Sequence, residues 1–155
     1  MNRKLILCIS LLFVIKAYAQ EKDGYHNSIG LSLGLPTGLN YKTFLTDKSA
    51  LDFVGGVRAG SDFSDVWVTG LYEMHIDLKA DGAKFYYGAG ASILYSNLIA
   101  NHIGMGVNLC VGLEYKFPEA PFVFAADWSP IIWLYGHNKE FDGMSGAIKV
   151  RYVLN

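Results

Sequence analysis

The sequence predicts an all-β fold: an eight-stranded antiparallel up-and-down barrel that crosses a membrane. From about residue 25 to residue 154, charged residues and large apolar residues take alternate positions in segments of strand length. Alternate side chains of a strand point to opposite faces, so one face is uncharged and apolar and the other holds glycine, serine, alanine and isolated charges. The chain has 17 glycines and 17% charged residues, against about 25% in ordinary soluble domains. An apolar outside with a polar inside is the pattern of a barrel in lipid.

The N-terminus has the pattern of a secretory signal peptide. Positive residues 2–4 (Asn-Arg-Lys) precede an apolar run over residues 5–15, and residues 17–19 (Ala-Tyr-Ala) form a cleavage site. The apolar run is shorter than the about 20 residues of a transmembrane helix. We therefore expect a cleaved signal peptide at residues 1–19 and one outer-membrane barrel domain at residues 20–155.

The composition of the mature chain excludes some classes. Cleavage removes three of the 13 Lys and Arg residues and none of the 14 Asp and Glu residues, so the net charge falls to −4. With no basic stripe, nucleic acid is not an expected partner. Cys110 is then the remaining cysteine, so an intramolecular disulfide cannot form.

The first four strands follow from alternation and turn residues. The first alternates Leu and Ile with Ser, Gly and His, and ends at a Pro-Thr-Gly turn. The second and third place Lys42 and Asp52 on the polar side and join through an Asp-Lys-Ser turn. The fourth follows a polar loop and places Trp67, Glu73 and His75 together on the inner side.

The last four strands continue the pattern. The fifth follows an Asp-Gly turn, and the sixth opposes seven large apolar residues to Gly, Asn, Cys, Glu and Lys. The seventh continues past Pro130, and the eighth alternates Ile, Val, Tyr and Leu with Ser, Ala, Lys149 and Arg151. An even strand number brings both ends of the chain to one side, which we expect to be the periplasm. The strands are expected at residues 25–35, 39–45, 50–59, 66–76, 85–95, 103–117, 122–134 and 143–154.

The polar side is assigned to the lumen. A soluble barrel would crowd that side with Lys, Glu and Asp, whereas here small residues dominate, as suits a lumen that side chains fill. Lys or Arg facing lipid at mid-bilayer would cost about 2–4 kcal/mol each. Aromatic residues share the apolar parity near strand ends and predict girdles at the membrane interfaces. They are Tyr25, Phe53, Tyr72, Phe85, Tyr115, Phe122, Trp128 and Tyr152.

The inward charges are expected to pair, because an unpaired ion in a narrow lumen is costly. Asp127 and Lys149 come at similar heights on neighbouring strands, and Lys42 and Asp52 are close across a hairpin. We predict an ion-pair network that plugs the lumen and fixes its register, and a gated ion path through the same residues is the alternative. The network comprises Lys42, Asp52, Arg58, Glu73, Glu114, Asp127, Lys149 and Arg151.

Several motifs resemble the small outer-membrane β-barrel proteins of Bacteroidota-type bacteria. They are residues 86–91 (Tyr-Tyr-Gly-Ala-Gly-Ala), 112–118 (Gly-Leu-Glu-Tyr-Lys-Phe-Pro), 127–130 (Asp-Trp-Ser-Pro), 149–152 (Lys-Val-Arg-Tyr), 35–39 (Leu-Pro-Thr-Gly-Leu) and 41–45 (Tyr-Lys-Thr-Phe-Leu). The chain is also similar, more distantly, to the OmpA-like transmembrane domain. These resemblances imply architecture and an outer-membrane location in a Gram-negative cell rather than a chemistry.

Three classes of function stay open. The first is a structural or surface-interaction protein whose partners are outer-membrane lipid and, during insertion, periplasmic chaperones and the barrel-assembly machinery. The second is a narrow channel for small solutes. The third is a lipid-modifying enzyme, for which His102 with Ser96 or His137 with Glu140 are weak candidates, since neither pair has a recognisable catalytic or metal-ligand spacing.

We expect no enzyme activity, no cofactor and no metal. One surface patch is a further hypothesis, since residues 131–135 (Ile-Ile-Trp-Leu-Tyr) are apolar for an outer loop. Trp133, Leu134 and Tyr135 are the candidates for contact with an unknown surface ligand.

Overall fold

A computed structural model describes residues 25–59, 64–96, 102–136 and 141–154. The predicted signal peptide lies outside these residues. No helix among the described residues is long and apolar enough to span a membrane. The strands are β1 (Asn27–Leu35), β2 (Gly38–Thr46), β3 (Ser49–Ala59), β4 (Ser64–Asp77), β5 (Ala83–Ser96), β6 (His102–Lys116), β7 (Phe122–Trp128), β8 (Ile131–Tyr135), β9 (Phe141–Asp142) and β10 (Gly146–Leu154).

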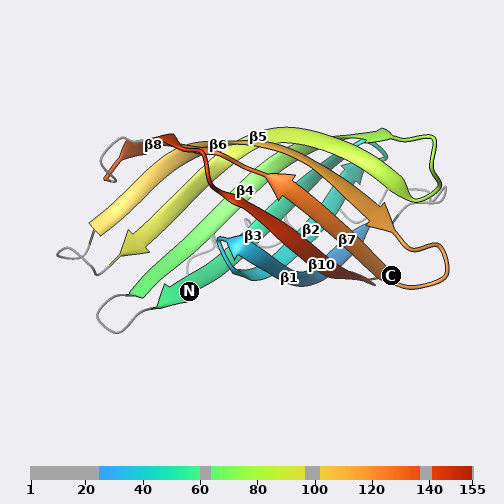
Figure 1. Cartoon of the computed structure of the whole chain (residues 1–155), viewed down its shortest axis with the longest axis horizontal. Helices are drawn as coiled ribbons and strands as arrows, with labels where there is room; N and C mark the ends of the chain where they lie inside the picture. Colours follow the sequence, from blue (N-terminus) through green and yellow to red (C-terminus); the bar gives the residue numbers. More distant parts are fainter. Residues whose placement is uncertain (1–24, 60–63, 97–101, 137–140, 155) are drawn as a thin grey trace, which may run out of the picture.

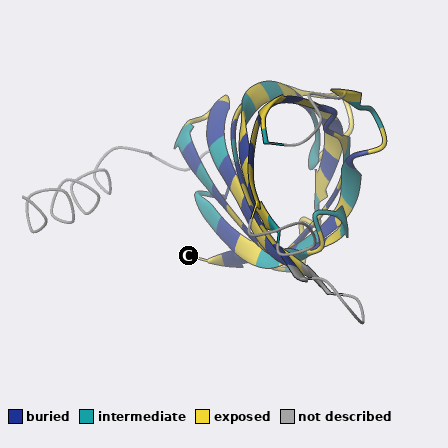
Figure 2. Cartoon of the chain, turned by 90° about the vertical axis from the view of Figure 1, so that its left-hand side faces the viewer, coloured by how far each residue is buried: buried dark blue, intermediate teal, exposed yellow. Residues whose placement is uncertain are grey.

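The strands form one closed antiparallel barrel with eight crossings (Figures 1 and 2). Strands β1 to β7 pair in chain order, β10 pairs with β7, and the β1–β10 ladder closes the ring. Strand β8 continues the crossing of β7 after a break at Ser129-Pro130 and pairs with β6. Strand β9 pairs with β8 and precedes β10 in the last crossing. The predicted fold class is confirmed.

The predicted alternation sets the faces of the barrel. Figure 2 shows buried and exposed residues alternating along each strand. On β6, the side chains from Ile103 to Tyr115 at every second position are exposed, and Asn108, Cys110 and Glu114 between them are buried. Among the strand residues whose side chains the structure describes, Asp77 at the end of β4 is the one exposed Asp, Glu, Lys or Arg. The outer wall is therefore an apolar belt.

The start of β1 and the end of β10 lie at one end of the barrel, because Asn27 pairs with Leu154. The β2–β3, β4–β5 and β6–β7 turns lie at this terminal end. Gly82 in the β4–β5 turn has a φ of 81°, a left-handed conformation that glycine adopts without strain. The sequence predicted a turn at this residue.

Two details of the sequence prediction are wrong. The eighth strand is not continuous from residue 143, since residues 143–145 separate β9 from β10. Large apolar residues are also not confined to the outside: three apolar clusters fill parts of the lumen. The members are Tyr25, Phe44, Ala50, Val123 and Val153; Leu71, Tyr86, Cys110 and Ala125; and Trp67, Leu94, Ile131 and Trp133.

Candidate functional site

The lumen holds a buried ion-pair network to which six strands contribute. Each charged member occupies an inward position set by the period of its strand. Small inward residues of β1 leave space for it: Ser28 and Ser32 are buried, and Gly30 pairs with Arg151. A Cβ atom at Gly30 would lie 2.6 Å from the Arg151 Cα atom, so this close approach requires glycine. The charged members are Lys42 (β2), Asp52 (β3), Glu73 (β4), Glu114 (β6), Asp127 (β7), and Lys149 and Arg151 (β10).

One half of the network is centred on Glu114. Its Oε2 atom accepts from Lys42 Nζ at 3.0 Å and from Arg151 Nη2 at 2.8 Å. The Tyr25 hydroxyl donates to Oε1 at 3.2 Å and to Oε2 at 3.1 Å. Lys42 Nζ also lies 2.6 Å from Glu73 Oε2 and 4.3 Å from the centre of the Tyr86 ring. Both cations of this half are fully buried.

The other half is centred on Asp52 and Lys149. Lys149 Nζ lies 2.7 Å from Asp52 Oδ2 and 2.8 Å from Asp127 Oδ2. The Asn40 side-chain amide donates to Asp52 Oδ1 and, at 3.0 Å, to the carbonyl of Phe53. The Tyr86 hydroxyl donates to Asp127 Oδ2 at 2.9 Å. Both Asp52 oxygens and Asp127 Oδ2 thus each have a nearby donor.

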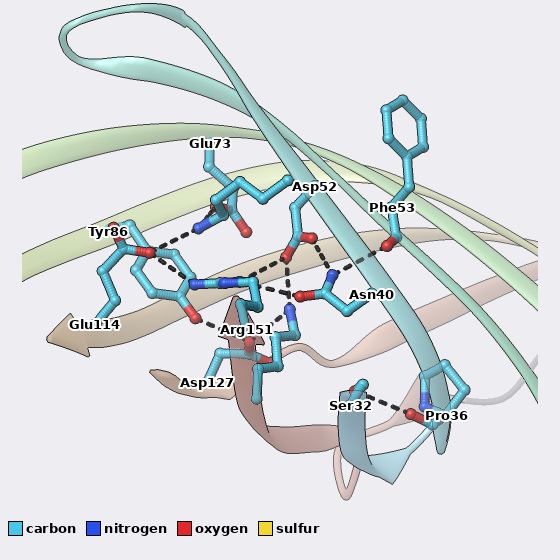
Figure 3. Close-up of polar contacts among 12 residues, drawn as sticks. Ser32, Pro36, Asn40, Asp52, Phe53, Glu73, Tyr86, Glu114, Asp127 and Arg151 are labelled. Atoms are coloured by element: carbon cyan, nitrogen blue, oxygen red, sulfur yellow. Dashed lines mark hydrogen bonds and ion pairs between the residues drawn. The ribbon is translucent and has the colours of Figure 1, made fainter. Parts of the chain in front are cut away.

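Arg151 joins the two halves. Its Nη2 atom donates to Glu114, and its Nη1 atom donates to Asn40 Oδ1 at 3.1 Å and lies 3.8 Å from Asp52 Oδ2. Figure 3 shows the guanidinium between the two carboxylates. A planar group with several fixed donors suits this bridging position better than an ammonium does.

The described network holds one carboxylate more than its cations balance. Four carboxylates face Lys42, Lys149 and Arg151, and His75 Nε2 lies 3.7 Å from both Glu73 and Glu114. Glu73 is fully buried, and neither of its oxygens has a hydrogen bond of good geometry. Glu73 is therefore the least supported anion of the network.

Apolar side chains lie in the lumen on both sides of the charges. Toward the terminal end, Phe44 packs on Tyr25 at a ring-centre distance of 5.0 Å and on His75 at 4.7 Å. Toward the opposite end, the Trp67 and Trp133 rings lie 5.7 Å apart. The Trp133 side chain reaches across Gly104 and Gly106, where added Cβ atoms would lie 3.2 and 3.1 Å from its ring. The lumen is a packed interior of charged and apolar layers.

The chemistry of this arrangement is electrostatic cross-linking of strands. Within the described part of the chain, no cluster of three or more His, Cys, Asp or Glu residues is arranged to hold a metal ion. His75 lies inside the network, and Cys110 is buried in an apolar cluster. Ser96 and His102 are register partners at the ends of β5 and β6, while His137 and Glu140 lie outside the described residues.

The structure brings together seven of the eight residues proposed for the network. Arg58 lies on β3, but its side chain is outside the described part. The Asp127–Lys149 pair is present. Lys42 and Asp52 are register partners across the hairpin, as expected, but their ion-pair partners differ: Lys42 binds Glu73 and Glu114, and Asp52 binds Lys149. The side chains reach across the lumen to strands that are not their hairpin neighbours.

Three uncharged side chains of the network had no assigned partner in the sequence analysis. Asn40 has inward parity, so its amide faces the charged lumen. A prediction based on charged residues alone does not include it. Tyr86 has inward parity on β5 and is fully buried. Tyr25 was wrongly placed in an outer girdle, because it precedes β1 and strand parity does not apply to it; it is 6% exposed.

The proposed surface patch also needs correction. Trp133 is 2% exposed and points into the lumen, whereas Leu134 and Tyr135 are exposed at 58% and 65%. Along β8 (residues 131–135), Ile131 and Trp133 are buried, whereas Ile132, Leu134 and Tyr135 are exposed. The three residues do not share one surface.

Comparisons with known proteins agree with the barrel geometry. No protein-family model and no curated protein matches the chain. The crystal structure of the N-terminal β-barrel domain of Pseudomonas aeruginosa OprF is similar, with a TM-score of 0.66 and 18% sequence identity over 87% of this chain and 100% of that domain. The chain has the fold of that barrel domain.

A second solved structure is similar over most of its length. The crystal structure of Neisserial surface protein A (NspA) has a TM-score of 0.49 and 12% identity, and the match covers 83% of this chain and 93% of that chain. The similarity to the OprF barrel domain supports the expected barrel at the level of the fold. No comparison supports the resemblance to Bacteroidota-type barrels, which stays a prediction.

Proposed function

We propose that this chain is an integral outer-membrane β-barrel protein with a sealed lumen and a structural or surface-interaction role. The observation that carries the proposal is the pairing of an apolar belt outside with a buried ion-pair network inside. Leu, Ile, Val, Phe and Tyr side chains on the outer wall are 37–67% exposed. Such a surface would be unstable in water and is stable against hydrocarbon.

The packed lumen supports a non-conducting, non-enzymatic role. A channel needs a continuous polar path, and here buried apolar clusters that contain Phe44 on one side and Trp67 with Trp133 on the other flank the charges in the lumen. An enzyme needs an accessible nucleophile beside a base, and the buried Cys110 thiol and His75 ring do not offer one. The outer-membrane OprF domain shares the fold, which supports the proposed location.

We place the terminal end of the barrel in the periplasm. The predicted signal peptide would deliver the chain there, and the barrel would then insert from that side. The described turns at this end carry exposed charges at Asp47, Lys48, Lys79, Asp81 and Glu119. These turns would not have to cross the bilayer. Insertion would require the periplasmic chaperones and the barrel-assembly machinery as partners.

Cell fractionation combined with gel mobility tests the proposal. We expect the protein in the outer-membrane fraction, and we expect an unheated sample to migrate differently from a boiled one, because a closed barrel resists detergent. A protein found in the soluble periplasm or the inner membrane would contradict the proposal. Unchanged lipid A and phospholipids in a deletion strain, measured by mass spectrometry, are expected for a non-enzyme; altered species would support the lipid-modifying alternative.

A further inference from the structure

An apolar hollow lies on the outer wall of the barrel near its terminal end. Its volume is about 410 Å³, within the range of about 300–1,000 Å³ that small-ligand sites have. The hollow extends from the β4–β5 turn across β6 and β7 to β10. Its lining includes Leu78, Ala83, Leu113, Tyr115, Phe124 and Ile148.

The floor of the hollow is made by one small residue. Ala126 is exposed on β7 and pairs with Leu113 of β6 on one side and with Ile148 of β10 on the other. Both partners are large and exposed, at 54% and 58%. A methyl group between these two long side chains leaves a depression, which the exposed Phe124 and Trp128 side chains bound along β7.

The β4–β5 turn and an aromatic ring close the hollow on the side nearest the terminal end of the barrel. Leu78 lies in the β4–β5 turn and Ala83 begins β5, and the Leu78 amide donates to the Ala83 carbonyl at 3.0 Å. Tyr115 packs edge-on against Phe117, with ring centres 5.0 Å apart, and Phe117 packs against Phe124 at 5.5 Å. These aromatic contacts hold the wall in one shape.

We propose that this hollow binds one acyl chain of a glycerophospholipid from the periplasmic leaflet. The proposal rests on the membrane placement proposed above, which puts the terminal half of the outer wall at the depth of that leaflet. The walls present carbon to the hollow, since the Glu114 side chain of the lining is 1% exposed and points into the lumen. A methylene chain in the hollow would make dispersion contacts with its apolar walls, and these contacts are missing when the hollow is empty.

Substitution of the floor residue tests the proposal. Ala126→Phe should fill the hollow. Ala91→Phe is the matched control, because Ala91 is an exposed alanine of β5 whose register partner on β4 is Gly70, so two large side chains do not flank it. In native mass spectrometry of protein purified from outer membranes in mild detergent, wild type and Ala91→Phe should each retain one phospholipid. Ala126→Phe should lose it.

Several results would overturn the proposal. Equal lipid retention by wild type and Ala126→Phe, or no retention by wild type, would do so. A retained lipopolysaccharide would show the wrong leaflet, and a wild-type dimer that Ala126→Phe dissociates would show a second copy in the hollow. All three proteins should still fractionate with the outer membrane; failure of the wild type to do so would contradict the proposed function instead.

A second measurement does not depend on any variant. Wild-type barrel in vesicles of phosphatidylethanolamine with a diazirine at mid-chain should, after irradiation, give adducts concentrated on the peptides of β6 and β7. The outward residues of β3 and β4 provide the reference wall. Equal labelling of both walls would contradict a bound chain.

Discussion

At the residue scale, the stability of this barrel depends on how fully each buried ion is satisfied. Burial of a charge costs several kcal/mol, and pairing offsets that cost only when geometry and further hydrogen bonds are good. Arg151 meets this condition by contacting Glu114, Asn40 and Asp52. Glu73 meets it poorly, since its one close cation is Lys42, which Glu114 shares.

Arg151→Met should lower the free energy of unfolding by about 3–5 kcal/mol, because it leaves buried carboxylates without their bridging cation. Thermal unfolding in detergent, followed by the loss of the unheated gel band, measures this. Lys84→Met is the control: its pair with Asp77 at 3.5 Å is partly exposed and should matter by less than about 1 kcal/mol. An equal loss of unfolding free energy in the two variants would show that the Arg151 bridge stabilises the barrel no more than a surface ion pair does.

Glu73→Gln and Glu114→Gln should differ although both remove one buried carboxylate. The Glu73 change relieves the excess negative charge and should shift stability by less than about 1 kcal/mol. The Glu114 change removes the partner of Lys42, Arg151 and Tyr25 and should cost about 3 kcal/mol or more. Denaturant unfolding in lipid vesicles compares them, and a larger loss for Glu73→Gln would refute this description of the network.

The membership of the network followed from strand parity and from the cost of unpaired buried ions. Its pairing followed only in part: the predicted Asp127–Lys149 pair is present, but a sequence gives register along a hairpin and says little about contacts across a lumen. Lys42 illustrates this difference: its hairpin partner is Asp52, and its ion-pair partners are on β4 and β6. Tyr25 shows the other limit, since parity assigns a face only within a strand.

At the element scale, the wall changes character where β7 gives way to β8. Proline has no amide hydrogen and breaks a ladder, and the Pro130 carbonyl accepts from the Leu109 amide at 3.2 Å across this break. The alternation then resumes in β8 with Ile131 and Trp133 inward. The sequence indicated that the strand continues past Pro130. Residues 131–135 are all apolar, however, so their pattern does not show which face of the strand carries Trp133.

Trp133→Ser should destabilise the barrel, whereas Tyr135→Ser should not. Removal of a buried large aromatic side chain typically costs about 3–5 kcal/mol, and Trp133 packs against Trp67 and Ile131 in the lumen. Tyr135 is 65% exposed and its loss should cost less than about 1 kcal/mol. The gel-mobility temperature profile of the two variants checks this, and similar profiles would contradict the inward placement of Trp133.

At the scale of the whole molecule, the barrel is held by complementary layers. Eight crossings close a ring too narrow for a wide pore, and inward side chains fill it with a charged layer between apolar layers. The fold class, the strand number and the inward charges were predictable, because period-two alternation runs the length of the chain. The apolar lumenal layers were predictable only in part: strand parity placed Trp67 inside, whereas inward Leu71 and Trp133 have the composition of outward residues.

A sealed lumen predicts no steady ion conductance. Wild-type protein reconstituted in a planar bilayer should give no stable single-barrel current steps, because ions would have to displace both the network and the Trp67–Trp133 layer. A mock reconstitution without protein supplies the background. Reproducible steps at a fixed conductance would favour the channel alternative and contradict the packed interior.

The three tryptophans directly test whether the apolar face of the barrel meets lipid and the charged face meets the lumen. Trp128 is 51% exposed on the outer wall, while Trp67 and Trp133 are 6% and 2% exposed inside. Fluorescence quenching by phospholipids with brominated acyl chains compares a variant that keeps Trp128 alone with Trp128→Phe. We predict strong quenching of Trp128 and weak quenching of the lumenal pair; stronger quenching of the lumenal pair would contradict the orientation of the barrel.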